Sequence, residues 1–248
     1  MSKATVLNNI DHKGVKVDTQ PSLYKNEHVN RSMIYVTEIG ELHKEFPLVF
    51  YKAPDSDKGQ LQLHAILGLE KDENLFLGVN GWNSRFVPAL LARGPFSLGY
   101  KKSENDDSDD SEQAAPVICI NMQDSRVNTE QGEDIFLQYG GEAPYLSYVK
   151  KALQTIENGI KFNQTLYALV EELDLLEPVS IQIKLSNIEE VNFNDYYTVN
   201  QQKLAQLDGE KLARLSQYGV LSLLYFVLSS MGNFQQLTEL KNAKSAMF

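Results

Sequence analysis

The chain has 248 residues, 42% of them hydrophobic, and includes 12 tyrosines and 11 phenylalanines. This is enough apolar material for a sizeable buried core. The formal net charge of −10 argues against a nucleic-acid partner, because phosphate binding needs a basic face. The single cysteine, Cys119, excludes an internal disulfide.

The two ends of the sequence bear on location. Residues 1–21 are polar, show no lasting periodicity and end at Pro21, so we expect a loose N-terminal arm. The start lacks the apolar run of about 7–15 residues that a secretory signal needs, which favours the cytoplasm, with cell-surface association as the alternative. The uncharged run 218–231 is shorter than the roughly 18 residues that span a bilayer, so we expect no transmembrane segment. Within this run, Val220–Met231 would form a helix that is apolar on every face. Such a helix fits either the core of the protein or an interface between two copies of the chain.

The first half of the chain has the residue composition of short strands. Residues rich in β-branched and aromatic types predict strands at Ser32–Ile39, Pro47–Tyr51, Leu61–Leu69 and 116–122. Between them, six of the nine residues 104–112 are acidic, which predicts a mobile acidic loop over 103–115. Calcium binding is the alternative for this run, although it lacks the glycine and distal glutamate of an EF-hand loop.

From Ala143 onwards the apolar residues recur every three to four positions, which is the spacing of a helix. A helix is predicted from Pro144 to a break at Gly159, and a second helix from Phe162 to Pro178. A hairpin of Val179–Leu185 with Val191–Val199, turning at Ser186-Asn187, follows. Asp208 is a predicted helix cap, and Gly219 and Gly232 are predicted helix breaks. The predicted fold is α+β, with a strand-rich, mostly antiparallel part at 22–140 packed on a helix-rich part at 141–240. We expect one compact domain over 22–240.

The stretch 74–100 combines the only tryptophan with aromatic, glycine and basic residues. It predicts a strand, a turn at Asn80-Gly81, a short helix and a second strand. Aromatic faces and planar cations are the residue types that dominate peptide and protein interfaces. We therefore predict a partner-binding surface made of Trp82, Arg85, Phe86, Arg93 and Phe96. In the alternative interpretation the aromatic residues are core and the arginines pair with local acids.

Catalytic and cofactor motifs are not found. None of the histidines, His12, His28, His43 and His64, is spaced as a metal pair, and His43 and His64 are expected to be satisfied polar or core residues. There is no nucleophile elbow and no phosphate-binding loop, and Cys119 lies in an apolar run where a thiol is usually inert. We predict no catalytic residue, no metal and no cofactor.

Several segments, taken in their order along the chain, resemble a known protein family. They are EFPLVF at 45–50, HAILGLEKDENLFL at 64–77, WNSRFVPALLARGPF at 82–96, LVEELDLLEP at 169–178 and the run 197–237 that begins YTVNQQKLAQL. In this order they resemble the SapC-like family of bacterial proteins over residues 22–240. Two features depart from the family pattern. Ala92-Arg93-Gly94 stands where a pair of arginines before Tyr-Pro-Phe is usual, and the acidic run after Lys102 looks like an insertion.

The resemblance implies little chemistry. The family takes its name from a protein linked to a bacterial surface layer, and its members occur beside genes for flavin-dependent halogenases, cupin-like hydroxylases and TonB-dependent receptors. It supplies no catalytic residues. We expect a non-enzymatic binding or accessory protein that recognises a peptide or protein partner, in a peptide- or tryptophan-modifying system. The alternatives are a surface-layer or envelope-associated structural protein and an enzyme whose metal site is assembled from distant residues.

Overall fold

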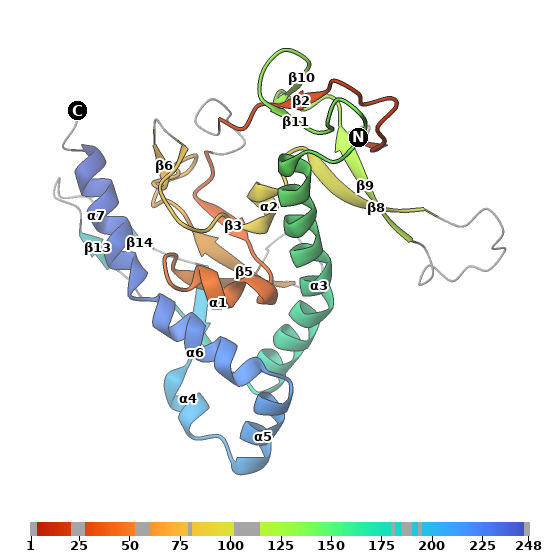
Figure 1. Cartoon of the computed structure of the whole chain (residues 1–248). Coiled ribbons are helices and arrows are strands. Elements are labelled where there is room, and N and C mark those ends of the chain that lie inside the picture. The colour runs from red at the N-terminus through yellow and green to blue at the C-terminus, as the bar shows by residue number, and fades with distance from the viewer. Residues whose placement is uncertain are drawn as a thin grey trace. The chain divides into compact units, whose positions relative to one another are not determined.

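A computed structural model describes residues 4–20, 28–52, 60–78, 81–101, 115–179, 182–184, 190–192 and 195–245 (Figure 1). It is a mixed α+β protein with antiparallel sheets, as the sequence predicts. The chain groups into two compact units. Unit 1 consists of Met1–Tyr24 and Ala92–Gln154, and unit 2 consists of Lys25–Leu91 and Thr155–Phe248.

Unit 1 is built from short strands and the first part of α3. Its strands are β1 (Ala4–Val6), β2 (Lys16–Val17), β8 (Phe96–Lys101), β9 (Ala115–Asn121), β10 (Val127–Asn128) and β11 (Glu133–Asp134). They form two antiparallel sheets with the orders β1-β9-β8 and β10-β2-β11. The prediction of a loose N-terminal arm is corrected for residues 4–20. These residues supply two paired strands, and Val15 and Val17 are buried in the core with Ile120 and Ile135.

Strand β9 confirms the strand predicted at 116–122, but its burial is lower than its composition suggests. Of its residues only Ile120 is fully buried. The reason is that the sheet extends beyond the core. The end of the β8–β9 ladder at Ala115 and Pro116 is exposed. The acidic run 104–112 lies outside the described residues.

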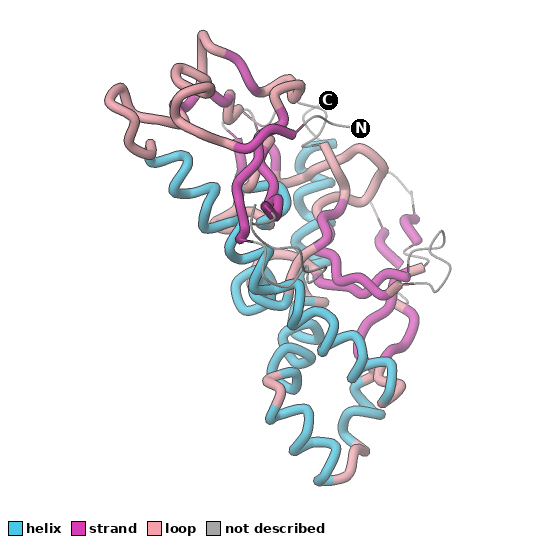
Figure 2. The backbone as a smooth tube through the Cα atoms, turned by 90° about the vertical axis from the view of Figure 1, so that its right-hand side faces the viewer, coloured by secondary structure: helices cyan, strands magenta, loops and turns pink. Residues whose placement is uncertain are grey.

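Unit 2 is organised around a five-stranded antiparallel sheet. Its strands, in spatial order, are β12 (Leu176–Pro178), β15 (Tyr196–Val199), β4 (Leu48–Lys52), β5 (Leu61–Ile66) and β3 (Arg31–Met33). The strand predicted at Pro47–Tyr51 is confirmed, and the strand predicted at Leu61–Leu69 is confirmed as far as Ile66. Figure 2 shows the strands of the protein in magenta and its helices in cyan. Two further pairs are β13 (Gln182–Lys184) with β14 (Glu190–Asn192), and β6 (Leu77–Gly78) with β7 (Gly81–Trp82).

The predicted hairpin of Val179–Leu185 with Val191–Val199 is present only in part. β13 pairs with β14, whereas β15, which covers the end of the second predicted strand, pairs with β12 and β4. The predicted turn at Ser186-Asn187 lies outside the described residues, as does Asn80 of the other predicted turn. The strand predicted at Ser32–Ile39 is wrong after Met33. There the chain turns into the 3₁₀ helix η3 (Val36–Glu38) and α1 (Ile39–Leu42). The Glu38 carboxylate accepts the Tyr35 amide at 3.0 Å, so a first-turn hydrogen bond outweighs the β-branched composition.

The helices are α2 (Ala89–Ala92), α3 (Pro144–Glu172), α4 (Gln201–Ala205), α5 (Gly209–Gln217), α6 (Val220–Ser230) and α7 (Asn233–Ser245). The Asp208 side chain caps α5 by accepting the Lys211 amide at 2.9 Å, and Gly219 separates α5 from α6 at φ +70°, as predicted. Val220, Leu224 and Val227 of α6 are buried in the core of unit 2, so α6 is a core helix on that side.

No single helix within the described ranges combines the length and apolar character that crossing a bilayer requires. One pair of consecutive helices, Gly209–Gln217 with Val220–Ser245, meets the length and composition criteria together, but it is bent by 90°.

The predicted break at Gly159 is wrong, because α3 runs unbroken through 29 residues. A Cβ at Gly159 would lie 2.4 Å from Cβ of Tyr35 and 2.9 Å from Oγ1 of Thr37. The glycine therefore serves a close approach of helix backbone to the segment after β3. On the same face of α3, Asn163 accepts the Val36 amide at 2.8 Å, and the Tyr167 hydroxyl accepts the Leu63 amide at 3.0 Å.

Replacing Gly159 with alanine tests this close contact. Helix propensity alone would stabilise Gly159→Ala by about 1 kcal/mol, but overpacking against Tyr35 costs about 1–3 kcal/mol. Since the added methyl meets two carbons and an oxygen that are themselves fixed, the overpacking cost should exceed the propensity gain, and we expect a net loss of about 1–2 kcal/mol, measured by denaturant unfolding. Gly40→Ala in α1 is the matched control, because nothing lies within 4 Å of its Cβ position. Equal or higher stability of Gly159→Ala would contradict the packing account.

Candidate functional site

Trp82 stands at the edge of the unit 2 core. Its ring stacks on Phe76 with centroids 6.4 Å apart and meets Phe46 edge-on at 6.5 Å. Phe46 and Phe76 are fully buried, whereas Trp82 is half-buried. Trp82 thus packs on the core with one side and is partly exposed to solvent on the other. It has a feature of each interpretation, the core residue and the surface residue.

The residues after Trp82 are fixed by one carboxylate, Glu45, which follows α1. Its oxygens accept the Arg85 amide at 3.1 Å, the Arg85 Nε–H at 2.5 Å and the Ser84 hydroxyl. Burial opposes the charge on Glu45, but these hydrogen bonds outweigh it and lower its pKa. Glu45 has 12% of its side chain exposed and Arg85 has 74%, so the glutamate anchors a segment whose arginine projects into solvent.

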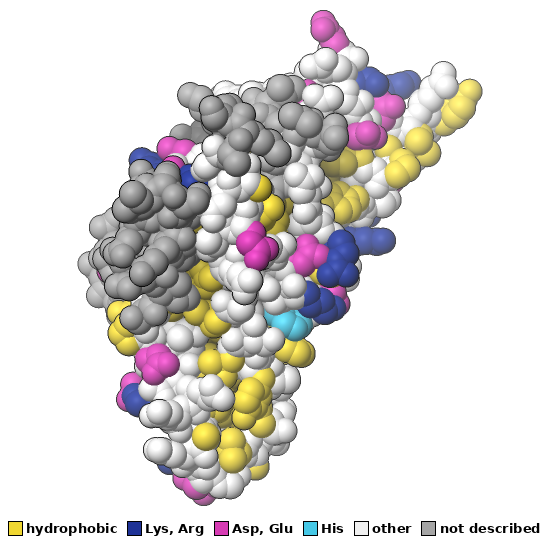
Figure 3. All heavy atoms as spheres, turned by 90° about the vertical axis from the view of Figure 1, so that its left-hand side faces the viewer, with side chains coloured by type: hydrophobic (Ala, Val, Ile, Leu, Met, Phe, Trp, Pro, Cys, Tyr) yellow, Lys and Arg dark blue, Asp and Glu magenta, His cyan; other side chains and the backbone are white. Residues whose placement is uncertain are grey.

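Two cations lie close to the Phe86 ring. Nζ of Lys44 is 5.7 Å from the centroid of its ring, and Cζ of Arg85 is 5.5 Å from it. Next to them is a polar hollow of about 480 Å³, lined by Lys44, Glu45, Asn83, Ser84, Arg85 and Gln236. Figure 3 shows a cluster of Lys and Arg side chains (dark blue) beside a His side chain (cyan). We call Trp82, Arg85 and Phe86, together with Lys44 and Glu45, the Trp82 surface.

The other two predicted residues belong to unit 1. Phe96 is 0% exposed and packs edge-on against Tyr145 at 6.2 Å, so its side chain is part of a core rather than of a surface. The Arg93 guanidinium donates to the Phe96 carbonyl. Asp124 pairs with Arg126 at 2.8 Å, and the hydrogen bond from Arg126, with a smaller effect from the Arg93 charge, lowers the pKa of Asp124. The structure therefore groups Trp82, Arg85 and Phe86, and places Arg93 and Phe96 in another unit.

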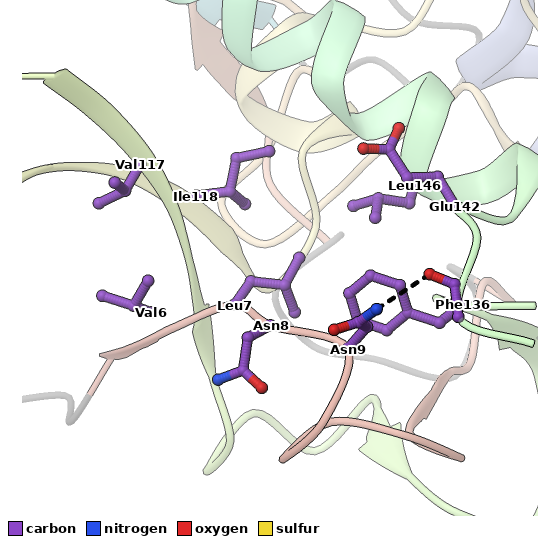
Figure 4. Close-up of a pocket in the computed structure, with 10 residues that line it drawn as sticks. Val6, Leu7, Asn8, Asn9, Val117, Ile118, Phe136, Glu142 and Leu146 are labelled. Atoms are coloured by element: carbon purple, nitrogen blue, oxygen red, sulfur yellow. Dashed lines mark hydrogen bonds between the residues drawn. The ribbon is translucent and has the colours of Figure 1, made fainter.

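Unit 1 has an apolar groove of about 370 Å³ that sequence reasoning missed. Figure 4 shows Val6 and Val117 at one end, Leu146 and Phe136 at the other, and Leu7 and Ile118 between them. The Asn9 amide closes one side by donating to the Gly140 carbonyl at 3.1 Å. No motif marks this groove, because it depends on the pairing of β1 with β9.

A second group that the sequence did not reveal lies on one face of the five-stranded sheet. Arg31 donates to the Tyr196 hydroxyl at 2.6 Å, and its Cζ lies 4.2 Å from the centroid of the Tyr51 ring. Burial opposes the Arg31 charge, but contacts with Tyr196 and Tyr51 outweigh it and raise the Arg31 pKa. The His64 ring meets Tyr51 at 5.4 Å, and its Nε2 lies 2.9 Å from Oε1 of Gln62. We call Arg31, Tyr51, His64 and Tyr196 the Arg31 cluster.

His64 was expected to be a satisfied core residue, and only half of that expectation is confirmed. The residue is 7% exposed, but its Nδ1 has no hydrogen-bond partner. Burial, helped by the nearby Arg31 charge, lowers the pKa of His64 to about 4. Among the described residues, no group of three or more His, Cys, Asp or Glu side chains is arranged to hold a metal ion.

The fold is that of a mixed α+β protein, and the Trp82 surface and the Arg31 cluster each combine aromatic rings with cations. A family model described as SapC matches residues 7–237 of the chain. The protein therefore belongs to the SapC family, which confirms the resemblance seen in the sequence. No curated protein and no solved structure matches the chain.

The lowered pKa of His64 makes stability depend on pH. In the folded state the ring stays neutral down to about pH 4, whereas in the unfolded chain it takes up a proton near pH 6.5. The contribution of neutral His64 is therefore complete above pH 6.5 and is lost as the pH falls towards 4. The loss amounts to about 3 kcal/mol. When the pH falls from 7 to 4, the free energy of unfolding of His64→Gln should therefore drop by about 3 kcal/mol less than that of the parent protein, as measured by denaturant unfolding. Identical pH profiles would contradict the assignment.

Proposed function

We propose that this SapC-family protein is a non-enzymatic binding protein that holds a peptide or protein partner on the Trp82 surface. The observation that supports this most is the exposed Arg85. Its backbone and side chain are both fixed by Glu45, so the guanidinium is positioned in advance beside Phe86 and the polar hollow. A cation held in place loses little conformational freedom on binding, which favours affinity.

The residue types also fit partner binding. Tryptophan and arginine are among the residues found most often at interface hot spots, and phenylalanine is enriched at interfaces. Lys44 and Arg85 both lie close to the Phe86 ring, so an incoming aromatic or acidic side chain would meet both a ring and cations. The local acids Glu41 and Glu45 already balance these cations, which favours a mixed rather than a strongly acidic partner.

We further propose that the partner belongs to a peptide- or tryptophan-modifying system, such as a flavin-dependent halogenase or a cupin-like hydroxylase. The support is the gene neighbourhood that SapC-family membership implies. Co-expression of the protein with a neighbouring halogenase or hydroxylase, followed by gel filtration, tests this proposal. Separate elution of the two proteins at micromolar concentration would contradict it.

Binding of the partner at the Trp82 surface is tested with matched arginine variants. Arg85→Ala removes the exposed cation and is expected to reduce partner recovery in a pull-down by about tenfold, which is the effect of losing a moderate hot spot. Arg214→Ala is the control, because Arg214 also lies in unit 2, is exposed and pairs with one glutamate, Glu172, at 2.5 Å.

Trp82→Ala combined with Arg85→Ala should abolish recovery, with circular dichroism used to confirm that the variant is folded. Full recovery with this double variant, or equal losses with Arg85→Ala and Arg214→Ala, would remove the support for this surface.

A further inference from the structure

The Arg31 cluster is assembled by strand register rather than by sequence proximity. In the ladders, Tyr51 is opposite both Gln62 and Tyr196, and His64 is opposite both Val49 and Met33. Residues that are opposite each other, or two apart on one strand, point to the same face of a sheet. Arg31, Tyr51, His64, Tyr196 and Thr198 therefore share one face, although they come from four strands.

Arg31 offers hydrogen-bond donors on this face. A guanidinium has five N–H donors, and the contacts of Arg31 are with the side chains of Tyr196 and Tyr51. Within the described part of the chain, no carboxylate lies within ion-pair distance of Arg31. In a protein with a net charge of −10, a partly buried arginine without an acidic neighbour is a candidate for binding an anion from outside the chain.

His64 offers the complementary group, an acceptor. Oε1 of Gln62 can only accept, so Nε2 of His64 carries the proton and donates to it. In the neutral ring Nδ1 then keeps a bare lone pair, and this buried atom has no partner. Thr198 Oγ1, on the same face and opposite Glu177 of β12, is also buried without a partner. Buried polar atoms in native proteins almost always have a partner, so each of these two atoms calls for either an ordered water molecule or a ligand.

These groups limit what the missing ligand can be. A metal ion would be repelled by the positive charge of Arg31, because no described acidic side chain lies beside Arg31 to offset the two positive charges. A water molecule would satisfy Nδ1 but would leave the guanidinium without an anion. A carboxylate matches the planar fork of an arginine, and a neighbouring hydroxyl would supply the donor that His64 needs.

We propose that this sheet face binds a small hydroxycarboxylate. Its carboxylate accepts hydrogen bonds from Arg31, and its hydroxyl donates to His64 Nδ1. The tyrosine rings wall the site, and Tyr196 holds the guanidinium in place. This site lies on different side chains from the Trp82 surface and does not depend on the proposed partner.

Glycolate is the probe, with acetate and inorganic phosphate as comparisons. Titrating the ¹⁵N-labelled full chain with glycolate is expected to shift the His64 Nδ1 resonance, because that lone pair becomes a hydrogen-bond acceptor. Acetate lacks the hydroxyl, so it should bind at least several-fold more weakly and leave that resonance unchanged. An unchanged Nδ1 resonance in glycolate, or tighter binding of phosphate than of glycolate, would overturn the proposal.

Variants locate the site by calorimetry. Arg31→Gln should weaken glycolate binding by about tenfold or more, since it removes a charge-assisted pair. Tyr196→Phe, which deletes only the hydroxyl bonded to Arg31, should weaken it several-fold and covers the case in which Arg31→Gln does not fold. Arg85→Gln, on the Trp82 surface, should have no effect. Equal weakening by Arg85→Gln, or full affinity in a folded Arg31→Gln or in Tyr196→Phe, would show that glycolate binds elsewhere and would overturn the assignment.

Discussion

Unit 2 depends on the close approach of α3 to the chain segment that follows β3. Gly159 lets the helix backbone reach Tyr35 and Thr37, and one and two turns further along Asn163 and Tyr167 accept amide protons from Val36 and Leu63. These amides lie where the β3 ladder ends, so without the helix they would be buried and unpaired. Each would then cost about 1–3 kcal/mol. One small residue on the helix thus allows two otherwise unsatisfied groups of the sheet to be paired.

The same region holds the segment that carries the Trp82 surface. Glu38 of η3 accepts the Tyr35 amide with one oxygen and the Ala89 amide, at the start of α2, with the other. Burial raises the pKa of Glu38, whereas these two hydrogen bonds oppose the rise. Together with Glu45, Glu38 fixes the chain between Trp82 and α2 at two points. The segment that carries the Trp82 surface is therefore attached to the same unit as the Arg31 cluster, although the two groups share no side chain.

Local signals in the sequence were sufficient where neighbouring residues determine the structure. The cap at Asp208, the left-handed glycine at 219 and a strand beginning at Leu61 are all present as predicted. The sequence failed where distant residues decide. Gly159 looked like a break because helix propensity is local, whereas its reason is the contact with Tyr35. The Arg31 cluster has no spacing signal at all, since its members meet only once four strands have paired in register. The pairing of residues 4–20 with partners more than 100 residues away was hidden for the same reason.

Hydrogen exchange of three amides tests most directly whether one framework holds unit 2 together. Val36 donates to Asn163, Leu63 to Tyr167, and Ala89 to Glu38, each from a different element. If the contact at Gly159 organises the unit, native-state exchange should give these three amides the same opening free energy, and Asn163→Ala should lower all three together. An Ala89 amide that exchanges fast and independently of Asn163→Ala would show that the segment carrying the Trp82 surface is not held by that framework, and would contradict the account.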